Sequence, residues 1–248
     1  MIDTHAHLYM CKQPLNILID NAKQAGLTRI INIGINLDTS IKALDQAKQF
    51  PNFISSTIGI HPCDCKDFTA FETLKQLAQE HNFVAIGEIG LDYHHMTTSK
   101  KEQLHCFEAQ LSIAEELNLP VVIHNRKADD DIRTVIKQFP NVKKVLHCYS
   151  SSADYALSVI NENTYFSFTG MITEAKKGKL ISAIKAIPID HIMIETDCPY
   201  LVPHEKKGQE NEPAFVSYVA AKIASIKGLD LAETKHVLNK NSTHFFNL

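Results

Sequence analysis

Short apolar runs alternate with amphipathic segments along the chain. The runs are rich in β-branched residues and predict strands at 2–7, 28–34, 53–59, 83–88, 120–124, 143–147, 164–168 and 191–196. Most of the intervening segments, such as 67–80 and 102–117, carry apolar residues three and four positions apart, as amphipathic helices do. Strands that alternate with helices favour a parallel sheet. The pattern therefore predicts an α/β fold, a (β/α)8 barrel of the TIM type, in preference to an open doubly wound sheet.

Length and composition agree with one barrel. The chain has 248 residues, close to the roughly 250 typical of this fold, and 44% of them are hydrophobic. No Gly/Ser linker or block of charge divides the sequence, so we expect residues 1–248 to form a single domain. No apolar run approaches the ~20 residues that cross a bilayer, and no basic segment precedes an apolar one near the N-terminus. We therefore expect no contact with a membrane and a cytoplasmic location.

Charge and cysteine content narrow the classes of partner and site. A formal net charge of -3 argues against a broad basic surface that grips long DNA, so any contact with nucleic acid must be local. The six cysteines are scattered through a large chain instead of forming a framework, and we expect reduced thiols.

Metal-binding residue types recur where the predicted strands end. His5 and His7 are two residues apart, so both side chains leave the same face of the first strand. Two histidines alone are often ordinary surface residues. However, the third, fourth, fifth, sixth and eighth strands run into His61, Glu88, His124, His147 and Glu195-Thr196-Asp197. Because a barrel builds its chemistry at the carboxyl ends of several strands, this regular placement predicts a metal site.

Four of these histidines and two of these carboxylates serve as the predicted ligands, a set that exceeds one tetrahedral ion and suits two divalent cations. The predicted ligands are His5, His7 and Asp197 for one ion, His124 and His147 for the other, and Glu88 as the bridge. Two ions about 3.5–4 Å apart polarise a phosphoryl or carbonyl oxygen and activate water near neutral pH. Asp197 could also accept the proton of the attacking water, so Asp197 and Glu88 are the predicted catalytic residues. These ligand types suit Zn, Mn, Co or Mg, which leaves the metal open.

Four further residues are candidates for contact with the substrate. His61 could donate a hydrogen bond to a phosphate, although a structural role before Pro62 is an equal alternative. The guanidinium of Arg126 could hold a phosphate, the alternative being a salt bridge. Lys206 and Lys207, together with Lys176 and Lys177, could form a local basic rim, or could simply solubilise the surface.

Five motifs follow one another along nearly the whole chain: Asp3-Thr4-His5-Ala6-His7, Gly59-Ile60-His61-Pro62, Gly87-Glu88-Ile89-Gly90-Leu91-Asp92-Tyr93, His124-Asn125-Arg126-Lys127-Ala128 with Asp131, and Glu195-Thr196-Asp197-Cys198-Pro199-Tyr200-Leu201 with Pro203. In this order they resemble the motifs of the TatD family of metal-dependent hydrolases, within the amidohydrolase-like superfamily. The resemblance implies a divalent-metal hydrolase of phosphodiester bonds, usually a deoxyribonuclease with exonuclease character, and it supports the ligand set. Lysines stand at 206 and 207 where the family often has arginines, and lysine lacks the bidentate fork.

The expected substrate is thus a DNA end or a small phosphodiester. Two alternatives remain open on sequence alone. The same site could hydrolyse a carbonyl substrate such as a lactone, amide or aminoacyl ester, since two ions polarise a carbonyl equally well. A non-catalytic scaffold that binds a partner is the other alternative, against which a complete ligand set argues.

Overall fold

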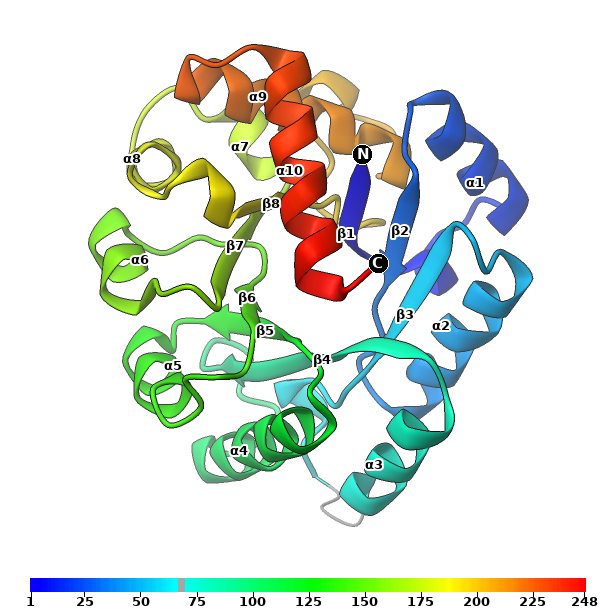
Figure 1. Ribbon diagram of the computed structural model, residues 1–248, viewed down its shortest axis with the longest axis vertical. Helices are drawn as coiled ribbons and strands as arrows, with labels where there is room; N and C mark the ends of the chain where they lie inside the picture. Colours follow the sequence, from blue (N-terminus) through cyan, green and yellow to red (C-terminus); the bar gives the residue numbers. More distant parts are fainter. Residues whose placement is uncertain (67–69) are drawn as a thin grey trace.

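The computed structural model describes residues 1–66 and 70–248, which fold around a ring of parallel strands enclosed by helices (Figure 1). The described residues form eight strands whose neighbours follow sequence order, from β1 to β8. The ring closes where Ala6 bridges Cys198 in parallel, with the amide of His7 donating to the carbonyl of Cys198 at 2.9 Å. The predicted (β/α)8 barrel is confirmed.

The strands lie close to their predicted positions. Their bounds are β1 Ile2–Ala6, β2 Arg29–Asn32, β3 Ile54–Ile58, β4 Phe83–Asp92, β5 Val121–Arg126, β6 Lys144–Leu146, β7 Thr164–Phe168 and β8 Ile192–Ile194. β4 is the exception, since it continues four residues past the predicted end at Glu88. Its register against β5 shifts between Ile86 and Ile89, and pairing then resumes as far as Asp92 and Arg126. Such an irregularity re-aims side chains, and here it falls on Glu88.

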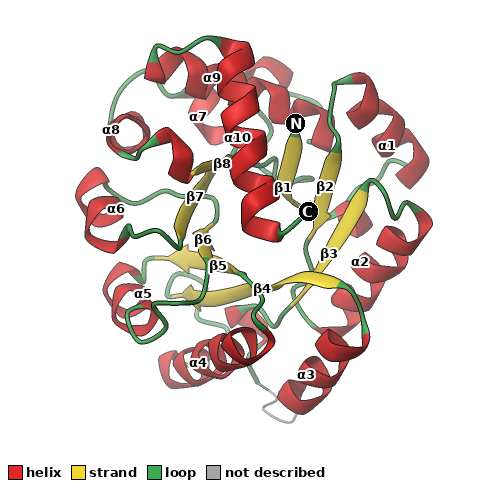
Figure 2. Cartoon of the chain, viewed as in Figure 1, coloured by secondary structure: helices red, strands yellow, loops and turns green. Residues whose placement is uncertain are grey.

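Helices cover the outside of the ring (Figure 2). Their bounds are α1 Leu15–Gln24, α2 Leu37–Gln49, α3 Ala70–Glu80, α4 Lys100–Leu117, α5 Asp129–Ile136, α6 Ala153–Val159, α7 Met171–Glu174, α8 Lys179–Ala186, α9 Val216–Lys227 and α10 Leu231–Phe246. The helix predicted over 67–80 is observed from Ala70, and 67–69 lie outside the described residues. Within the described parts of the chain, no helix is both long and apolar enough to span a bilayer.

The barrel interior is a packed core closed at one end by α10. Inward-facing residues of most strands form one cluster with Phe245 and Phe246, which are 0% and 2% exposed. α10 crosses the end of the barrel that faces the viewer in Figure 1. The carboxyl ends of the strands open at the other end, which leaves that rim free to build a site.

The expectation that all six cysteines are reduced thiols is wrong for one pair. Cys65, after the short 3-10 turn Pro62–Asp64, forms a disulfide with Cys106 of α4, with their Cα atoms 6.0 Å apart. The two residues are 41 positions apart in sequence, so only the tertiary fold brings them together. Cys11, Cys63, Cys148 and Cys198 are free.

Gly90 lets the extended part of β4 approach β5 closely. It has a φ of +132°, and a Cβ atom there would lie 2.1 Å from the carbonyl oxygen of His124. Replacing Gly90 with alanine should therefore destabilise the fold by at least about 2 kcal/mol, or roughly 4–8 °C in Tm for a chain of this size. Thermal unfolding measures the effect.

The matched control is Gly178→Ala. Gly178 also has a left-handed φ, +103°, but a Cβ atom added there would have no other atom within 4 Å. The Gly178 variant should have backbone strain but no steric clash of the added Cβ atom, so its Tm should fall less than that of the Gly90 variant. Equal losses in the two variants would contradict the close approach of β4 and β5.

Candidate metal centre

A cavity of about 800 Å³ opens where the strands end, and most of the predicted site residues line it. They are His7, His61, Glu88, His124, Arg126, His147 and Asp197. His5 lies beneath them with no exposed surface, and its ring stacks on that of His147 at 4.0 Å. Side chains from six strands thus meet at one cavity. The most distant of them in sequence, His5 and Asp197, are 192 positions apart.

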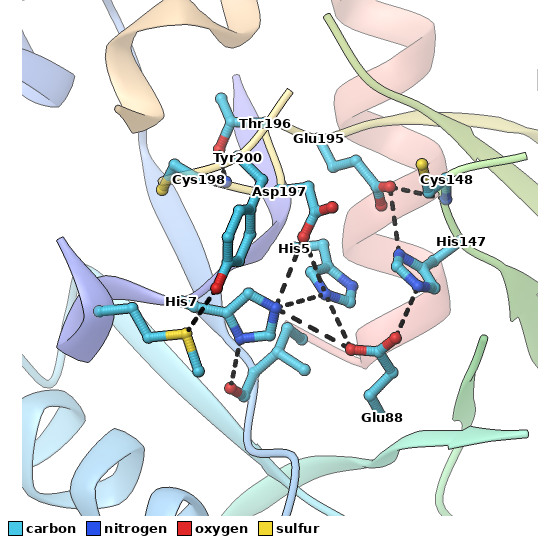
Figure 3. Close-up of polar contacts among 12 residues, drawn as sticks. His5, His7, Glu88, His147, Cys148, Glu195, Thr196, Asp197, Cys198 and Tyr200 are labelled. Atoms are coloured by element: carbon cyan, nitrogen blue, oxygen red, sulfur yellow. Dashed lines mark hydrogen bonds and ion pairs between the residues drawn. The ribbon is translucent and has the colours of Figure 1, made fainter. Parts of the chain in front are cut away.

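The first group of ligand atoms gathers around His5 (Figure 3). Its Nε2 lies 3.2 Å from Nε2 of His7, 3.4 Å from Oε2 of Glu88 and 3.6 Å from Oδ1 of Asp197. Nε2 of His7 lies 3.5 Å from the same Asp197 oxygen and 3.9 Å from Oε2 of Glu88. Ligand atoms about 2.1 Å from a tetrahedral ion are about 3.4 Å from one another. These four atoms therefore have the spacing that one cation requires.

The second group surrounds the other oxygen of Glu88. Oε1 lies 2.8 Å from Nε2 of His147, 2.9 Å from Nδ1 of His124 and 3.5 Å from Nε2 of His61. Glu88 thus presents one carboxylate oxygen to each group, which is the arrangement expected of a bridging ligand. His61, which was predicted to contact substrate, therefore lies next to the second group, with its Nε2 3.5 Å from the shared Glu88 oxygen.

Outer contacts fix how three of the imidazoles point. Nδ1 of His7 lies 3.1 Å from the carbonyl of Ile33, and because a carbonyl only accepts, the ring donates there and turns Nε2 to the site. Nε2 of His124 lies 3.1 Å from Oδ2 of Asp92, which leaves Nδ1 facing Glu88. Nδ1 of His147 faces Oε1 of Glu195 at 3.4 Å.

Glu195 and Asp92 are themselves held in place. Glu195 accepts hydrogen bonds from the amide of Cys148 at 2.7 Å and from the hydroxyl of Ser167 at 2.5 Å. Oδ1 of Asp92 accepts the amides of His94 and His95, each at 2.8 Å. Such second carboxylates orient histidines in metal sites.

The electrostatics of the centre favour positive charge between the carboxylates. Burial alone would raise the pKa of Glu88, but His147, His61 and His124 outweigh it and hold that pKa well below its usual value. Burial likewise opposes the charge of His147, yet Glu88 and Glu195 raise its pKa well above the usual range. Divalent cations bound between these carboxylates would supply that positive charge and displace protons from the ligands.

The loop after β8 is tied to β1, which positions Asp197. Both carboxylate oxygens of buried Asp3 accept from Thr196, one from its amide at 2.9 Å and the other from its hydroxyl at 2.6 Å. The amide of Asp197 donates to the carbonyl of His5 at 2.8 Å. Asp197 adopts a φ of +56°, a conformation uncommon outside glycine and often found at functional sites.

The lysines predicted to bind substrate lie elsewhere. The cavity lining formed by the described residues includes neither Lys206 nor Lys207. Nζ of Lys206 lies over the ring of Phe215 at 5.0 Å, and Nζ of Lys207 pairs with Glu174 at 2.7 Å. Arg126 is the one predicted substrate-binding cation that the fold places in the described lining.

Sequence reasoning gave no role to Glu195 and left two alternatives for Asp92, which could orient ligands or serve only in packing. Asp92 is four residues after Glu88, a spacing that favours one face of a strand, so the pattern held a signal for it. Glu195 is two residues before Asp197, a spacing that also favours one face, but its contact with His147 comes from another strand and could not be read from spacing.

Comparison with known proteins identifies the family of the chain. The sequence model for TatD-related DNases matches residues 2–247. The chain is 36% identical to the uncharacterized metal-dependent hydrolase YabD of Bacillus subtilis, over 100% of this chain and 99% of that protein. It is 32% identical to the 3′-5′ ssDNA/RNA exonuclease TatD of Erwinia tasmaniensis, over 93% of each.

A solved structure shows the same fold. The crystal structure of YJJV, a TatD homologue from Escherichia coli K12, superposes with a TM-score of 0.91 at 25% identity, covering 100% of this chain and 98% of that one. The family match over nearly the whole chain and the converged histidines and carboxylates lead to one assignment. The chain belongs to the TatD-related DNase family and is a metal-dependent hydrolase.

Proposed function

We propose that this protein hydrolyses phosphodiester bonds at the ends of single-stranded DNA, using two divalent cations. The observation that carries the proposal is Glu88, whose two oxygens face two separate groups of histidines at the floor of an open cavity. The exonuclease name of the Erwinia relative supports this substrate class.

The proposed ligand set divides between the two oxygens of Glu88. His5, His7 and Asp197 would hold one cation, and His124 and His147 the other. When bound, such a pair polarises a phosphoryl oxygen and supplies a nucleophile near neutral pH.

Residues at the cavity wall would position and serve the reacting phosphate. Asp197 would accept a proton from the attacking water, since its carboxylate lines the cavity. Nδ1 of His61 accepts the amide of Cys63 at 3.1 Å, so in the neutral ring Nε2 carries the proton and can donate to a phosphate oxygen. Arg126 would hold the phosphate of the nucleic acid with its planar fork.

The substrate class is tested with chelator-stripped protein to which Mg, Mn or Zn is restored. Each form is incubated with short single-stranded DNA and with a panel of lactones, amides and aminoacyl esters. We expect DNA hydrolysis that requires an added metal, and two ions per chain by elemental analysis. Intact DNA under every metal, with a carbonyl compound hydrolysed instead, would overturn the nuclease proposal and leave the hydrolase assignment standing.

Arg126→Gln should weaken the binding of DNA by about tenfold, because a charge-assisted pair with a phosphate is lost. It should also lower the slope of log affinity against log salt by about 0.7, the value for one contact with a single strand. Fluorescence anisotropy with a cleavage-resistant phosphorothioate oligonucleotide across a salt series measures both quantities.

Lys207→Gln is the matched control, since its charge is already paired with Glu174 outside the cavity. Its salt slope should equal that of the unmodified protein. If the slope decreases in the lysine variant and is unchanged in the arginine variant, the phosphate contact lies in the loop after β8 and not at Arg126.

A further inference from the structure

The cavity lining includes four large apolar side chains from the segments after three strands. They are Met10, Met171, Tyr200 and Leu201, and the ring of Tyr200 lies beside that of His7 in the first group of ligands. Tyr200 and Met171 are unusually open for large apolar side chains, 54% and 36% exposed. We call these four residues the apolar shelf.

The tyrosine ring stands next to the proposed metal ligands. Its centroid is 6.4 Å from that of His7, with the two rings nearly perpendicular, and Figure 3 shows it beside Asp197 as well. The Tyr200 hydroxyl donates to the sulfur of Met10 at 3.5 Å, which holds the ring at the edge of the cavity. The backbone carbonyl of Tyr200 accepts from the side-chain amide of Asn211, so the loop is anchored independently of the ring.

Arg126 occupies a different part of the lining. It is the last residue of β5, two positions after His124, whereas the apolar shelf comes from the segments after β1, β7 and β8. Oε1 of Glu88 lies 2.9 Å from His124, on the same strand as Arg126, and Oε2 lies 3.9 Å from His7, whose ring is next to that of Tyr200. A molecule that spans the cavity over Glu88 would therefore meet a cation on one side and exposed apolar surface on the other.

We propose that the apolar shelf is a nucleobase subsite in which Tyr200 stacks on the base of the terminal nucleotide while its phosphate lies over Glu88. This inference rests on the proposed function and adds the group that selects a nucleotide end over other phosphodiesters. A nucleobase fits because it is planar and apolar on its faces, and stacking on an aromatic ring tolerates every base. The thioethers of Met10 and Met171 adapt to rings of different size.

The test compares oligonucleotides that carry a normal terminal nucleotide with oligonucleotides whose terminal nucleotide is abasic, at the 3′ end or at the 5′ end. For the normal substrate, Tyr200→Ala should lower kcat/KM by about 5- to 150-fold, mainly through KM. That range is the stacking free energy of about 1–3 kcal/mol per base, converted at 1.4 kcal/mol per tenfold. For the substrate that is abasic at the cleaved end, the same substitution should change kcat/KM less than twofold.

Two control variants separate stacking from other losses. Tyr200→Phe keeps the ring and should retain most of the activity, which also shows that the hydroxyl contact with Met10 is secondary. Leu157→Ala removes an equally exposed apolar side chain, 52% exposed on α6 and outside the cavity lining formed by the described residues. It should leave both substrates unaffected.

The outcomes distinguish the subsite from the function itself. A similar loss on normal and abasic ends in Tyr200→Ala would overturn the base subsite while leaving the nuclease intact. No effect of Tyr200→Ala on either substrate would also overturn the base subsite and leave the nuclease intact. If the unmodified protein cleaves neither oligonucleotide under any metal, the proposed function fails instead.

Discussion

Replacing Glu88 with alanine should remove at least one metal ion and reduce turnover by about a thousandfold or more. Its two oxygens face both groups of histidines, so no other described side chain could replace the bridge. Losing the polarisation that one ion supplies costs several kcal/mol in the transition state, and about 4 kcal/mol is a thousandfold in rate. Elemental analysis of purified protein and steady-state kinetics on single-stranded DNA measure the two effects.

The control for this variant is Glu174→Ala, which removes an exposed glutamate outside the cavity. It should keep both ions and full turnover. Circular dichroism checks that the Glu88 variant is folded. Two ions still bound to folded Glu88→Ala would rule out the bridge.

The barrel and the residues at the carboxyl ends of its strands could be predicted because both depend on local sequence patterns. Short apolar runs mark the strands, successive side chains on a strand alternate between its two faces, and parallel strands bring their carboxyl ends to one rim. His5, His124 and His147 therefore converge without any knowledge of the loops. The same reasoning found Glu88, although the shift in register between β4 and β5 that aims it was invisible in the sequence.

Loop conformation could not be predicted, because contacts between distant residues determine it. Lys206 and Lys207 are close in sequence to the cavity-lining loop, yet Lys206 packs over the ring of Phe215 and Lys207 pairs with Glu174, both outside the cavity lining. The position of Tyr200 depends on Asn211, to which no local pattern gives a role. The disulfide between Cys65 and Cys106 also depends on contacts between distant residues, because the packing of helix α4 on the barrel brings the two sulfur atoms together.

Asp197→Asn should reduce turnover by about 10²–10⁴-fold while changing metal content much less. Asparagine keeps the size of the side chain and one oxygen to face His5 and His7, but it cannot accept a proton from water. It also tolerates the left-handed φ of +56° at this position, so the loop should keep its conformation. Elemental analysis and kinetics on the same preparation give the ratio of the two effects.

The informative comparison is Asp197→Ala, which removes the ligand oxygen as well as the proton acceptor. Alanine is less suited to a left-handed φ, so this variant should lose metal and stability in addition to turnover. If Asp197 acts mainly as the proton acceptor, the two variants should be similarly slow, and only the alanine variant should be short of metal. An asparagine variant with normal turnover would place the proton acceptor elsewhere, and one that has lost an ion would make Asp197 chiefly a ligand.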